Sequence, residues 1–516
     1  MTTNARNDTF TRLKSLGLLF TAVACLLLFS FVAIHFVWHD GLASFASDSG
    51  NYMLMARYLS PWHDASEPVR LLWPLQDYPP FFPLILALCG TAYSMVASHL
   101  LTLFFLIAAL PLIYLFAKQL VTNRWQALAI TVLFAISPST WVNMLDILSE
   151  NLYLLLSMLV LLLFPHLQRQ RYGVAVLLGV LLTCLIMTRT IGAAMWAAYL
   201  IAACPFWKKA ALDIKTWLIP SAMVLASMLL LQLLNTSSVP DQYVQQFSAL
   251  ELGGQFSTLA DSWLTAWLLY WTDDLILSWL IAGALGLVAC GGLFVRAAQL
   301  KLDALYILLY LVILLAWPHP GQALRFIYPV QAVLLVHAFY FLQLVITKYT
   351  KFQPQKALAF VLLLTATAVL PALTFLYSRH NAGIAHGYHH IKEFYTIPDL
   401  PKAEINAAVQ TAMFRDMNFI EASTTAEDVV YYFEPTYVAL LANRHGRNLN
   451  GLTDSVPHIA APAAEYVYLS RMHPRNSTES FNGLEVGQSL GIPLSLQWSN
   501  VSSVDQAPVS NFSKID

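Results

Sequence analysis

Long runs without charge are the feature that most limits how this chain can fold. No formally charged residue occurs from Ser15 to His39. An α-helix of that length, rising about 1.5 Å per residue, crosses a hydrocarbon core about 30 Å thick. A cleaved signal peptide has a shorter apolar region, and here further apolar runs follow. We therefore expect a retained first transmembrane helix in a polytopic protein.

The rest of the chain repeats this pattern. It is 58% hydrophobic and only 11% charged, whereas soluble domains are about 25% charged. The first span and those that follow make about eleven transmembrane helices, with the further spans expected at 95–118, 125–142, 149–167, 172–188, 190–206, 216–234, 274–295, 302–317, 323–346 and 357–377. The stretch 82–97 reads either as another short membrane segment or as a re-entrant piece. The predicted fold class is an α-helical polytopic membrane protein.

Positive charge predicts the orientation of these helices. Arg6, Arg12 and Lys14 precede the first helix, which places the N-terminus in the cytoplasm. An odd number of spans then puts the tail outside. We expect a transmembrane module over 1–377, with outer loops at 39–94 and 235–273. An extracytoplasmic domain follows over 378–516, and its alternating runs at 428–434 and 465–470 predict a small α/β fold.

A first cluster of polar residues follows the first helix. The segment Asp48-Ser-Gly-Asn-Tyr52 continues as a helix to about Leu59, and Tyr78-Pro-Pro-Phe-Phe-Pro re-enters the apolar sequence. Four-residue spacing puts Asp48 and Tyr52 on one helical face. Asp48 either caps this helix or is available for chemistry.

A second cluster occupies the next outer loop. Asn143, Asp146, Glu150 and Tyr153 have the spacing of a single helical stripe. Two carboxylates on that stripe would be costly against lipid. They are either hydrated at the interface or directed into the bundle, and Glu150 lies where the chain enters the membrane.

Two arginines belong to the same outer side. Arg189 is the only charged residue between Arg171 and Lys208, so it reads either as a snorkelling arginine or as a partner for an anion. Arg325-Phe-Ile-Tyr328-Pro opens a long apolar helix. A guanidinium makes permanently charged, bidentate contacts with phosphate, and the alternative for Arg325 is a structural ion pair.

Further polar residues give weaker signals. Trp263 and Trp267 are typical of an aromatic belt at the membrane surface. His386, His389 and His390 could ligate a metal, but no spaced carboxylate accompanies them. The net charge of −1 gives no electrostatic basis for binding nucleic acid.

The Asp48, Tyr78, Glu150 and Arg325 motifs together resemble the GT-C type of integral-membrane glycosyltransferase, in its protein-mannosyltransferase and aminoarabinose-transferase branch (glycosyltransferase family 39). The likeness covers roughly the first 330 residues. The resemblance implies that Asp48 is the base that deprotonates the acceptor, or a metal ligand. The family often has Asp-Glu at this place, whereas this chain has Asp48-Ser49. No metal ligand is therefore assigned, although a divalent metal remains compatible with the resemblance.

The resemblance also assigns the remaining site residues. The family has a further acidic residue in the second outer loop, lining the donor cavity. Glu150 is preferred for this role and Asp146 is the alternative, so both are candidate catalytic acids. Arg325, with Arg189 and Tyr328, would bind the donor phosphate. We assign Tyr52 and Tyr78 to the substrate cavity, because they belong to the Asp48 motif.

The implied function is sugar transfer, of a hexosyl or pentosyl group, from a polyprenyl-phosphate donor to an acceptor hydroxyl, with inversion. The acceptor is a lipid, a glycan or a protein, and the membrane is expected to be a bacterial inner membrane. A transporter is one alternative, but it would place ionisable residues near the membrane midplane. A polysaccharide polymerase or ligase is the other.

Overall fold

The computed structural model describes residues 2–38, 47–72, 78–169, 172–208, 214–234, 252–270, 275–316, 323–349, 353–448, 464–470, 499–504 and 507–515. The chain forms two compact units. The first, here called the bundle unit, comprises Met1–Trp38, Leu100–Met144 and Ser149–Ser378. The second, here called the α/β unit, comprises His39–His99, Leu145–Leu148 and Arg379–Asp516.

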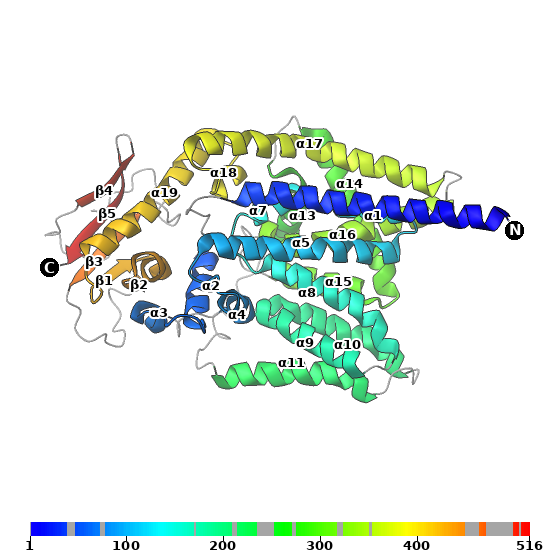
Figure 1. Cartoon of the computed structure of the whole chain (residues 1–516), viewed down its shortest axis with the longest axis horizontal. Coiled ribbons are helices and arrows are strands. Elements are labelled where there is room, and N and C mark those ends of the chain that lie inside the picture. Colours follow the sequence, from blue (N-terminus) through cyan, green and yellow to red (C-terminus); the bar gives the residue numbers. More distant parts are fainter. Residues whose placement is uncertain are drawn as a thin grey trace. The chain divides into compact units, whose positions relative to one another are not determined.

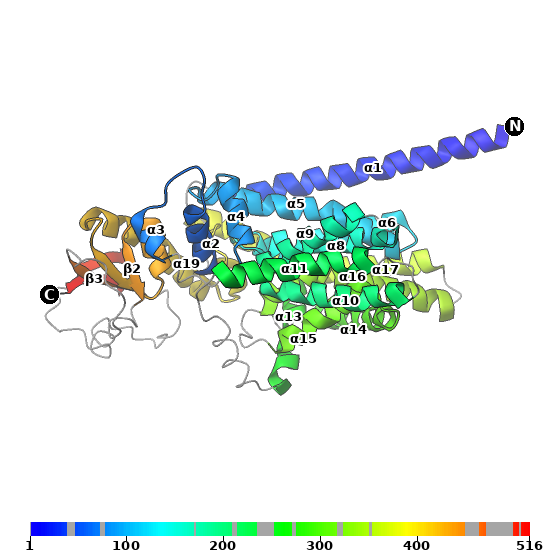
Figure 2. The same cartoon turned by 90° about the horizontal axis from the view of Figure 1, so that it is seen from below.

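Helices make up the bundle unit, and most of them run roughly parallel in both views (Figures 1 and 2). They are α1 (Thr2–Val37), α5 (Met95–Leu120), α6 (Arg124–Ala135), α7 (Pro138–Asn143), α8 (Glu150–Leu163), α9 (Tyr172–Thr188), α10 (Ala193–Lys208), α11 (Ile214–Leu234), α13 (Leu252–Leu268), α14 (Ile276–Ala298), α15 (Leu302–Leu315), α16 (Ala323–Tyr349) and α17 (Pro354–His386).

Among the described residues, six helices are long and apolar enough to cross a membrane: Ser15–Val37, Met95–Leu120, Glu150–Leu167, Ile276–Ala298, Arg325–Tyr349 and Pro354–His386. Five shorter apolar helices occur at 124–135, 172–188, 190–204, 216–230 and 302–315. Each of the eleven predicted apolar segments overlaps one of these helices. The chain is thus a multi-pass membrane protein, and the predicted helical polytopic fold is confirmed.

The contact between α14 and α16 is unusually close, because glycine allows it. A Cβ on Gly292 would lie 2.2 Å from the carbonyl oxygen of His337. A buried ion cluster lies beside this contact. Asp303 accepts hydrogen bonds from Arg296 Nε at 2.6 Å and Nη2 at 2.9 Å, and its Oδ2 lies 2.7 Å from His337 Nε2. Buried charged groups are costly unless they are paired, so the cluster fixes α14, α15 and α16 together.

The α/β unit combines short helices with a mixed sheet. Its described elements are α2 (Ser47–Tyr58), α3 (Glu67–Leu72), α4 (Phe81–Leu88), α18 (Glu393–Thr396), α19 (Leu400–Ser423), β1 (Val429–Tyr432), α20 (Pro435–Tyr437), the π-helix η6 (Val438–Ala442), β2 (His445–Asn448), β3 (Glu465–Ser470), β4 (Ser499–Val504) and β5 (Ala507–Ile515). The sheet order is β2-β1-β3-β5-β4. Strand β1 is parallel to β2 and β3, while β5 is antiparallel to β3 and β4.

Several sequence expectations have outcomes in this unit. Strands β1 and β3 form within the predicted runs 428–434 and 465–470, so the small α/β fold is confirmed. The stretch 82–97 holds most of α4, whose eight residues are too short to cross a membrane at about 1.5 Å per residue. The predicted outer loop 235–273 lies outside the described residues except for 252–270, where α13 forms. The assignment of 1–377 as the transmembrane module and of 378–516 as an extracytoplasmic domain stays a prediction.

Candidate functional site

In the bundle unit, three charged side chains meet at helix ends. Helix α8 begins at Glu150, Arg189 follows the last residue of α9, and Arg325 lies in the first turn of α16. Arg325 Nε donates to Glu150 Oε1, and Arg189 Nη1 forms an ion pair with the same oxygen. Glu150 is 1% exposed and Arg189 is 9% exposed. The structure therefore brings together three of the residues that the sequence singled out, from segments far apart in the chain.

The backbone conformation of Arg189 allows its side chain to reach Glu150. Its φ of −152° and ψ of 131° are extended, so it interrupts the helical path between α9 and α10. The short turn Thr190–Gly192 follows, and a Cβ on Gly192 would meet the carbonyl oxygen of Leu185 at 2.8 Å. Only glycine allows so tight a return of the backbone.

Two guanidinium groups and one carboxylate meet in this cluster. Glu150 contacts both Arg189 and Arg325, and these three side chains together carry one net positive charge at a place with little access to solvent. Aromatic contact offsets part of the cost of burying this charge, since Arg189 Cζ lies 4.9 Å and Arg325 Cζ 5.9 Å from the centre of the Phe326 ring. An anion such as phosphate would complement the remaining charge.

Buried tyrosine side chains lie near the cluster, and their hydroxyl groups are hydrogen-bonded to neighbouring residues. Tyr328 Oη donates to Asn151 Oδ1 at 2.7 Å, and Tyr310 Oη donates to the carbonyl of Phe326 at 2.7 Å. Tyr306 Oη donates to Tyr153 Oη at 3.2 Å. The predicted phosphate ligand Tyr328 is fully buried and holds Asn151, so its predicted role stays a prediction.

The predicted helical stripe through Asn143, Asp146, Glu150 and Tyr153 is wrong. Helix α7 ends at Asn143 and α8 begins at Glu150, so 144–149 is not helical. In this break, the amide of Leu148 donates to the carbonyl of Asp146 at 3.1 Å, which is a turn tighter than a helix. As a consequence of this break, Asp146 lies outside the helix α8 that carries Glu150.

Asp146 belongs to the α/β unit, and Lys392 is its partner there. Lys392 Nζ donates to Asp146 Oδ2 at 2.7 Å, and Asp146 is fully buried. Lys392 was not predicted from the sequence. The two residues are 246 positions apart, and no local pattern marks Lys392 as special.

A third group of polar side chains, also in the α/β unit, surrounds Asp48. Tyr78 Oη donates to Asp48 Oδ1 at 2.6 Å. The Tyr52 ring packs edge-on against Tyr78 at 5.4 Å and Phe82 at 5.0 Å. Burial and the neighbouring Asp48 raise the pKa of Tyr78 well above its usual range, so this phenol stays a hydrogen-bond donor. The structure thus groups Asp48, Tyr52 and Tyr78 as the motif suggested.

Asp48 lies inside the first turn of α2, because that helix already begins at Ser47. Two contacts with distant residues hold α2. Thr436 Oγ1 donates to Asn51 Oδ1 at 2.8 Å, and Arg57 Nη1 donates to the carbonyl of Leu440 at 2.8 Å. Neither partnership could be predicted from the sequence, since each joins residues more than 380 positions apart.

The described residues contain no group of three or more His, Cys, Asp or Glu side chains that could hold a metal ion. The histidines near the end of α17 stack on neighbours instead. His389 and His390 lie 5.5 Å apart edge to face, and His386 stacks on Tyr388 at 6.3 Å. The metal hypothesis for this cluster therefore gains no support from the structure.

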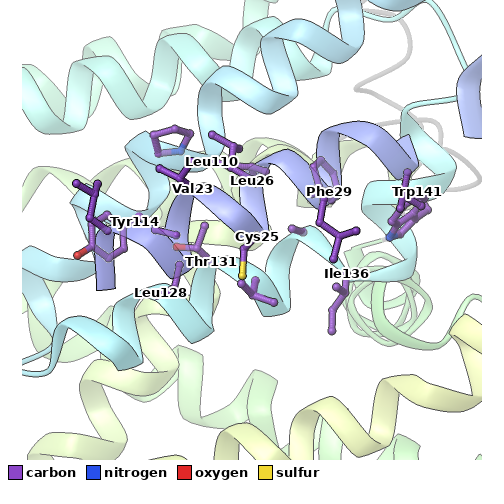
Figure 3. A pocket seen from close by; sticks show the side chains of 17 residues that line it. Val23, Cys25, Leu26, Phe29, Leu110, Tyr114, Leu128, Thr131, Ile136 and Trp141 are labelled. Carbon is purple, nitrogen blue, oxygen red and sulfur yellow. The ribbon is translucent and has the colours of Figure 1, made fainter. Parts of the chain in front are cut away.

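A pocket of about 440 Å³ lies among α1, α5 and α6 in the bundle unit (Figure 3). Its wall consists almost entirely of apolar side chains such as Leu26, Phe29 and Leu110. The hydroxyl of Thr131 is already bonded to the carbonyl of Ala127 at 2.9 Å. The pocket lining contains no carboxylate, histidine, lysine or arginine, so the Glu150 and Asp48 clusters remain the candidate sites for chemistry.

Comparison with solved structures identifies the fold. ArnT from Cupriavidus metallidurans in the apo state is similar over 98% of this chain and 98% of that chain, with 12% identity and a TM-score of 0.54. The same protein bound to undecaprenyl phosphate is similar over 97% of this chain and 98% of that chain, again with 12% identity and a TM-score of 0.54. An oligosaccharyltransferase from Archaeoglobus fulgidus is similar over 87% of this chain and 69% of that chain, with 12% identity and a TM-score of 0.47.

No protein-family model and no curated protein matches the sequence. The likeness to ArnT extends over nearly the whole of both chains, and at this identity it establishes the fold alone. This chain has the fold of the GT-C glycosyltransferases, as its motifs predict.

Proposed function

We propose that this protein is a membrane glycosyltransferase that takes its sugar from a polyprenyl-phosphate donor. The observation that carries the proposal is the convergence of Arg189 and Arg325 on the single carboxylate of Glu150. The two guanidinium groups lie close together at this carboxylate, and a phosphate beside them would gain charged contacts with both. The fold supports the proposal, since an ArnT structure with the same fold is described as bound to undecaprenyl phosphate.

In the proposed reaction, the acceptor hydroxyl attacks the anomeric carbon of the donor sugar. A bond forms between the acceptor oxygen and that carbon, while the bond from the carbon to the phosphate oxygen breaks. The hydroxyl proton passes to the carboxylate of Asp48, and the polyprenyl phosphate leaves with the bonding electrons. Direct attack of this kind inverts the configuration at the anomeric carbon.

The guanidinium groups would act on the leaving group. Negative charge grows on the phosphate as the sugar departs, and a fixed cation stabilises that charge more in the transition state than in the ground state. Arg325 is the main candidate for this cation, because it lies in the first turn of α16, where the helix dipole adds positive potential. Arg189 is the second candidate.

Asp48 is the proposed base. The hydroxyl of Tyr78 donates to one oxygen of its carboxylate, which fixes the direction of the carboxyl group. A base needs this orientation to reach the acceptor proton. Tyr52 packs against Tyr78 and would help to shape the acceptor side of the cavity. The acceptor would be a lipid, glycan or protein hydroxyl at the outer face of a bacterial inner membrane, with the N-terminus cytoplasmic and the 378–516 domain outside.

The test is transfer by purified protein from radiolabelled polyprenyl-phosphate sugars. We expect Asp48→Asn to lower kcat by about 10²–10⁴-fold, the range for general-base catalysis. We expect Arg325→Ala to lower it by about 10²–10³-fold, as for the loss of one transition-state donor. The matched controls are Asp64→Asn and Arg415→Ala, because both side chains are exposed in the α/β unit.

Full transfer by Asp48→Asn would return Asp48 to a structural role in α2. Absence of transfer by the wild-type protein with every donor tested would contradict the proposed function. Uptake without a chemical product would then favour a transporter, and long glycan chains would favour a polymerase.

A further inference from the structure

The break between α7 and α8 is where the chain passes from one compact unit to the other. Leu145–Leu148 belong to the α/β unit, whereas the bundle unit resumes at Ser149. Glu150 follows immediately, as the first residue of α8. Whatever holds the break therefore also holds the start of α8.

The charged anchor of the break is the pair formed by Asp146 and Lys392. The ammonium lies 2.7 Å from Asp146 Oδ2, the Asp146 side chain has no exposed surface and the Lys392 side chain is 18% exposed. Lys392 has little freedom, since the neighbouring Ile391 and the nearby Phe394 are fully buried. A buried carboxylate that has one ammonium partner is strongly bound to it, because its charge has little other compensation.

The residue after Lys392 is a second carboxyl group close to the Asp146–Lys392 pair. Glu393 is half-buried, and its removal from water and the charge of Asp146 raise its pKa. The groups that face it are Asp146, Lys392, the side chain of Gln410 and the Tyr437 phenol. Lys392 acts in the opposite direction and lowers that pKa, so its ammonium lies near both carboxyl groups. Its direct contact is with Asp146 Oδ2.

From these contacts we infer that Lys392 is a positioning residue for Glu150. By holding Asp146 inside the α/β unit, it fixes the backbone four residues before the carboxylate that both Arg189 and Arg325 share. The expected effect of Lys392 on donor binding rests on the proposed function. Its expected effect on the backbone between α7 and α8 is independent of that function.

Hydrogen–deuterium exchange of the full-length protein tests the effect on the break. Lys392→Met removes the ammonium and keeps most of the side chain. We expect faster exchange confined to the peptides that cover 144–153, and normal exchange in Lys392→Arg. The matched control is Lys402→Met, which removes an exposed lysine near the start of α19.

Transfer kinetics test the consequence for the donor. A misplaced Glu150 should raise the KM for the polyprenyl-phosphate sugar by about tenfold to a hundredfold, because small displacements from an optimal geometry are costly. The KM for the acceptor should stay unchanged, and Lys392→Arg should restore the KM for the donor. A merely structural role would lower the amount of active protein, and hence the apparent kcat, without this selective change.

Each outcome bears on the inference. Unchanged exchange over 144–153 in folded Lys392→Met would overturn it, and so would faster exchange spread over the whole molecule. If Lys392→Met fails to fold, the variant Asp146→Asn/Lys392→Met removes both charges and undergoes the same measurements. Faster local exchange in a protein whose wild type transfers no sugar would support the positioning role and contradict only the proposed function.

Discussion

Glu150 contacts two guanidinium groups at once, and this sharing governs how the site can bind an anion. A phosphate that enters competes with Glu150 for the same N–H donors and adds negative charge beside both arginines. The carboxylate therefore keeps the arginines in place while the site is empty. It also limits how tightly they bind a phosphate, which suits a site that must release its product.

Replacement of Glu150 by Gln is expected to destabilise the protein by about 3–5 kcal/mol, because it leaves two adjacent buried cations without a carboxylate. The measurement is thermal unfolding of the purified protein. Glu427→Gln is the control, since that side chain is exposed. We further expect added polyprenyl phosphate to raise the Tm of Glu150→Gln more than that of the wild type. An equal Tm for Glu150→Gln and the wild type would contradict the buried cluster.

Among the elements, α14 and α16 depend most on a single small residue. Gly292→Ala would place a methyl group 2.2 Å from the carbonyl oxygen of His337, so the helices must separate. Overpacking of this kind costs about 1–3 kcal/mol. Gly283→Ala is the matched control in the same helix, because its Cβ would meet only Leu264 Cδ2 at 4.0 Å.

The measurement for this pair is again the Tm, together with transfer activity, since α16 carries Arg325. We expect a lower Tm and lower activity for Gly292→Ala, and nearly unchanged values for Gly283→Ala. Equal behaviour of the two variants would show that α14 and α16 do not pack as closely as described.

Helices were the part of the structure most readily predicted from the sequence. An apolar run such as 15–39 has one stable form in lipid, because every backbone polar group must be bonded within the segment. Side-chain spacing was a poorer guide at 143–153. It assumes a continuous helix, and the turn at Asp146 that ends this continuity depends on a partner, Lys392, far away in the sequence.

For the whole molecule, the stability of the fold should depend on pH through Glu393. Its pKa is raised in the folded state, so the folded protein keeps a proton that the unfolded chain loses near its ordinary pKa of about 4.3. This contribution is fully present below that value and is lost as the pH rises through the folded-state pKa.

We therefore expect Glu393→Gln, which removes the ionisable group, to gain stability relative to the wild type as the pH rises from about 4 to 8. Thermal unfolding across that pH range measures the difference between the two proteins. Glu427→Gln again serves as the exposed control. A constant difference between Glu393→Gln and the wild type at all pH values would contradict the raised pKa.

The candidate sites could be predicted only in part, for a reason that also concerns the whole chain. Motifs identified Asp48, Glu150, Arg189 and Arg325, because charged residues beside apolar helices stand out. The partners in the α/β unit did not stand out. Lys392 belongs to none of the motifs, and only the folded chain brings it to Asp146.

Contacts with carboxylates hold helix α16 at two positions along its length. Arg325 in its first turn contacts Glu150, and His337, twelve residues further on, contacts Asp303. A shift of α16 by one residue, about 1.5 Å along its axis, would break both contacts at once. We therefore expect that α16 does not slide along its axis during the reaction. Any movement that admits a substrate or expels a product must be a rotation of side chains or a displacement of other segments.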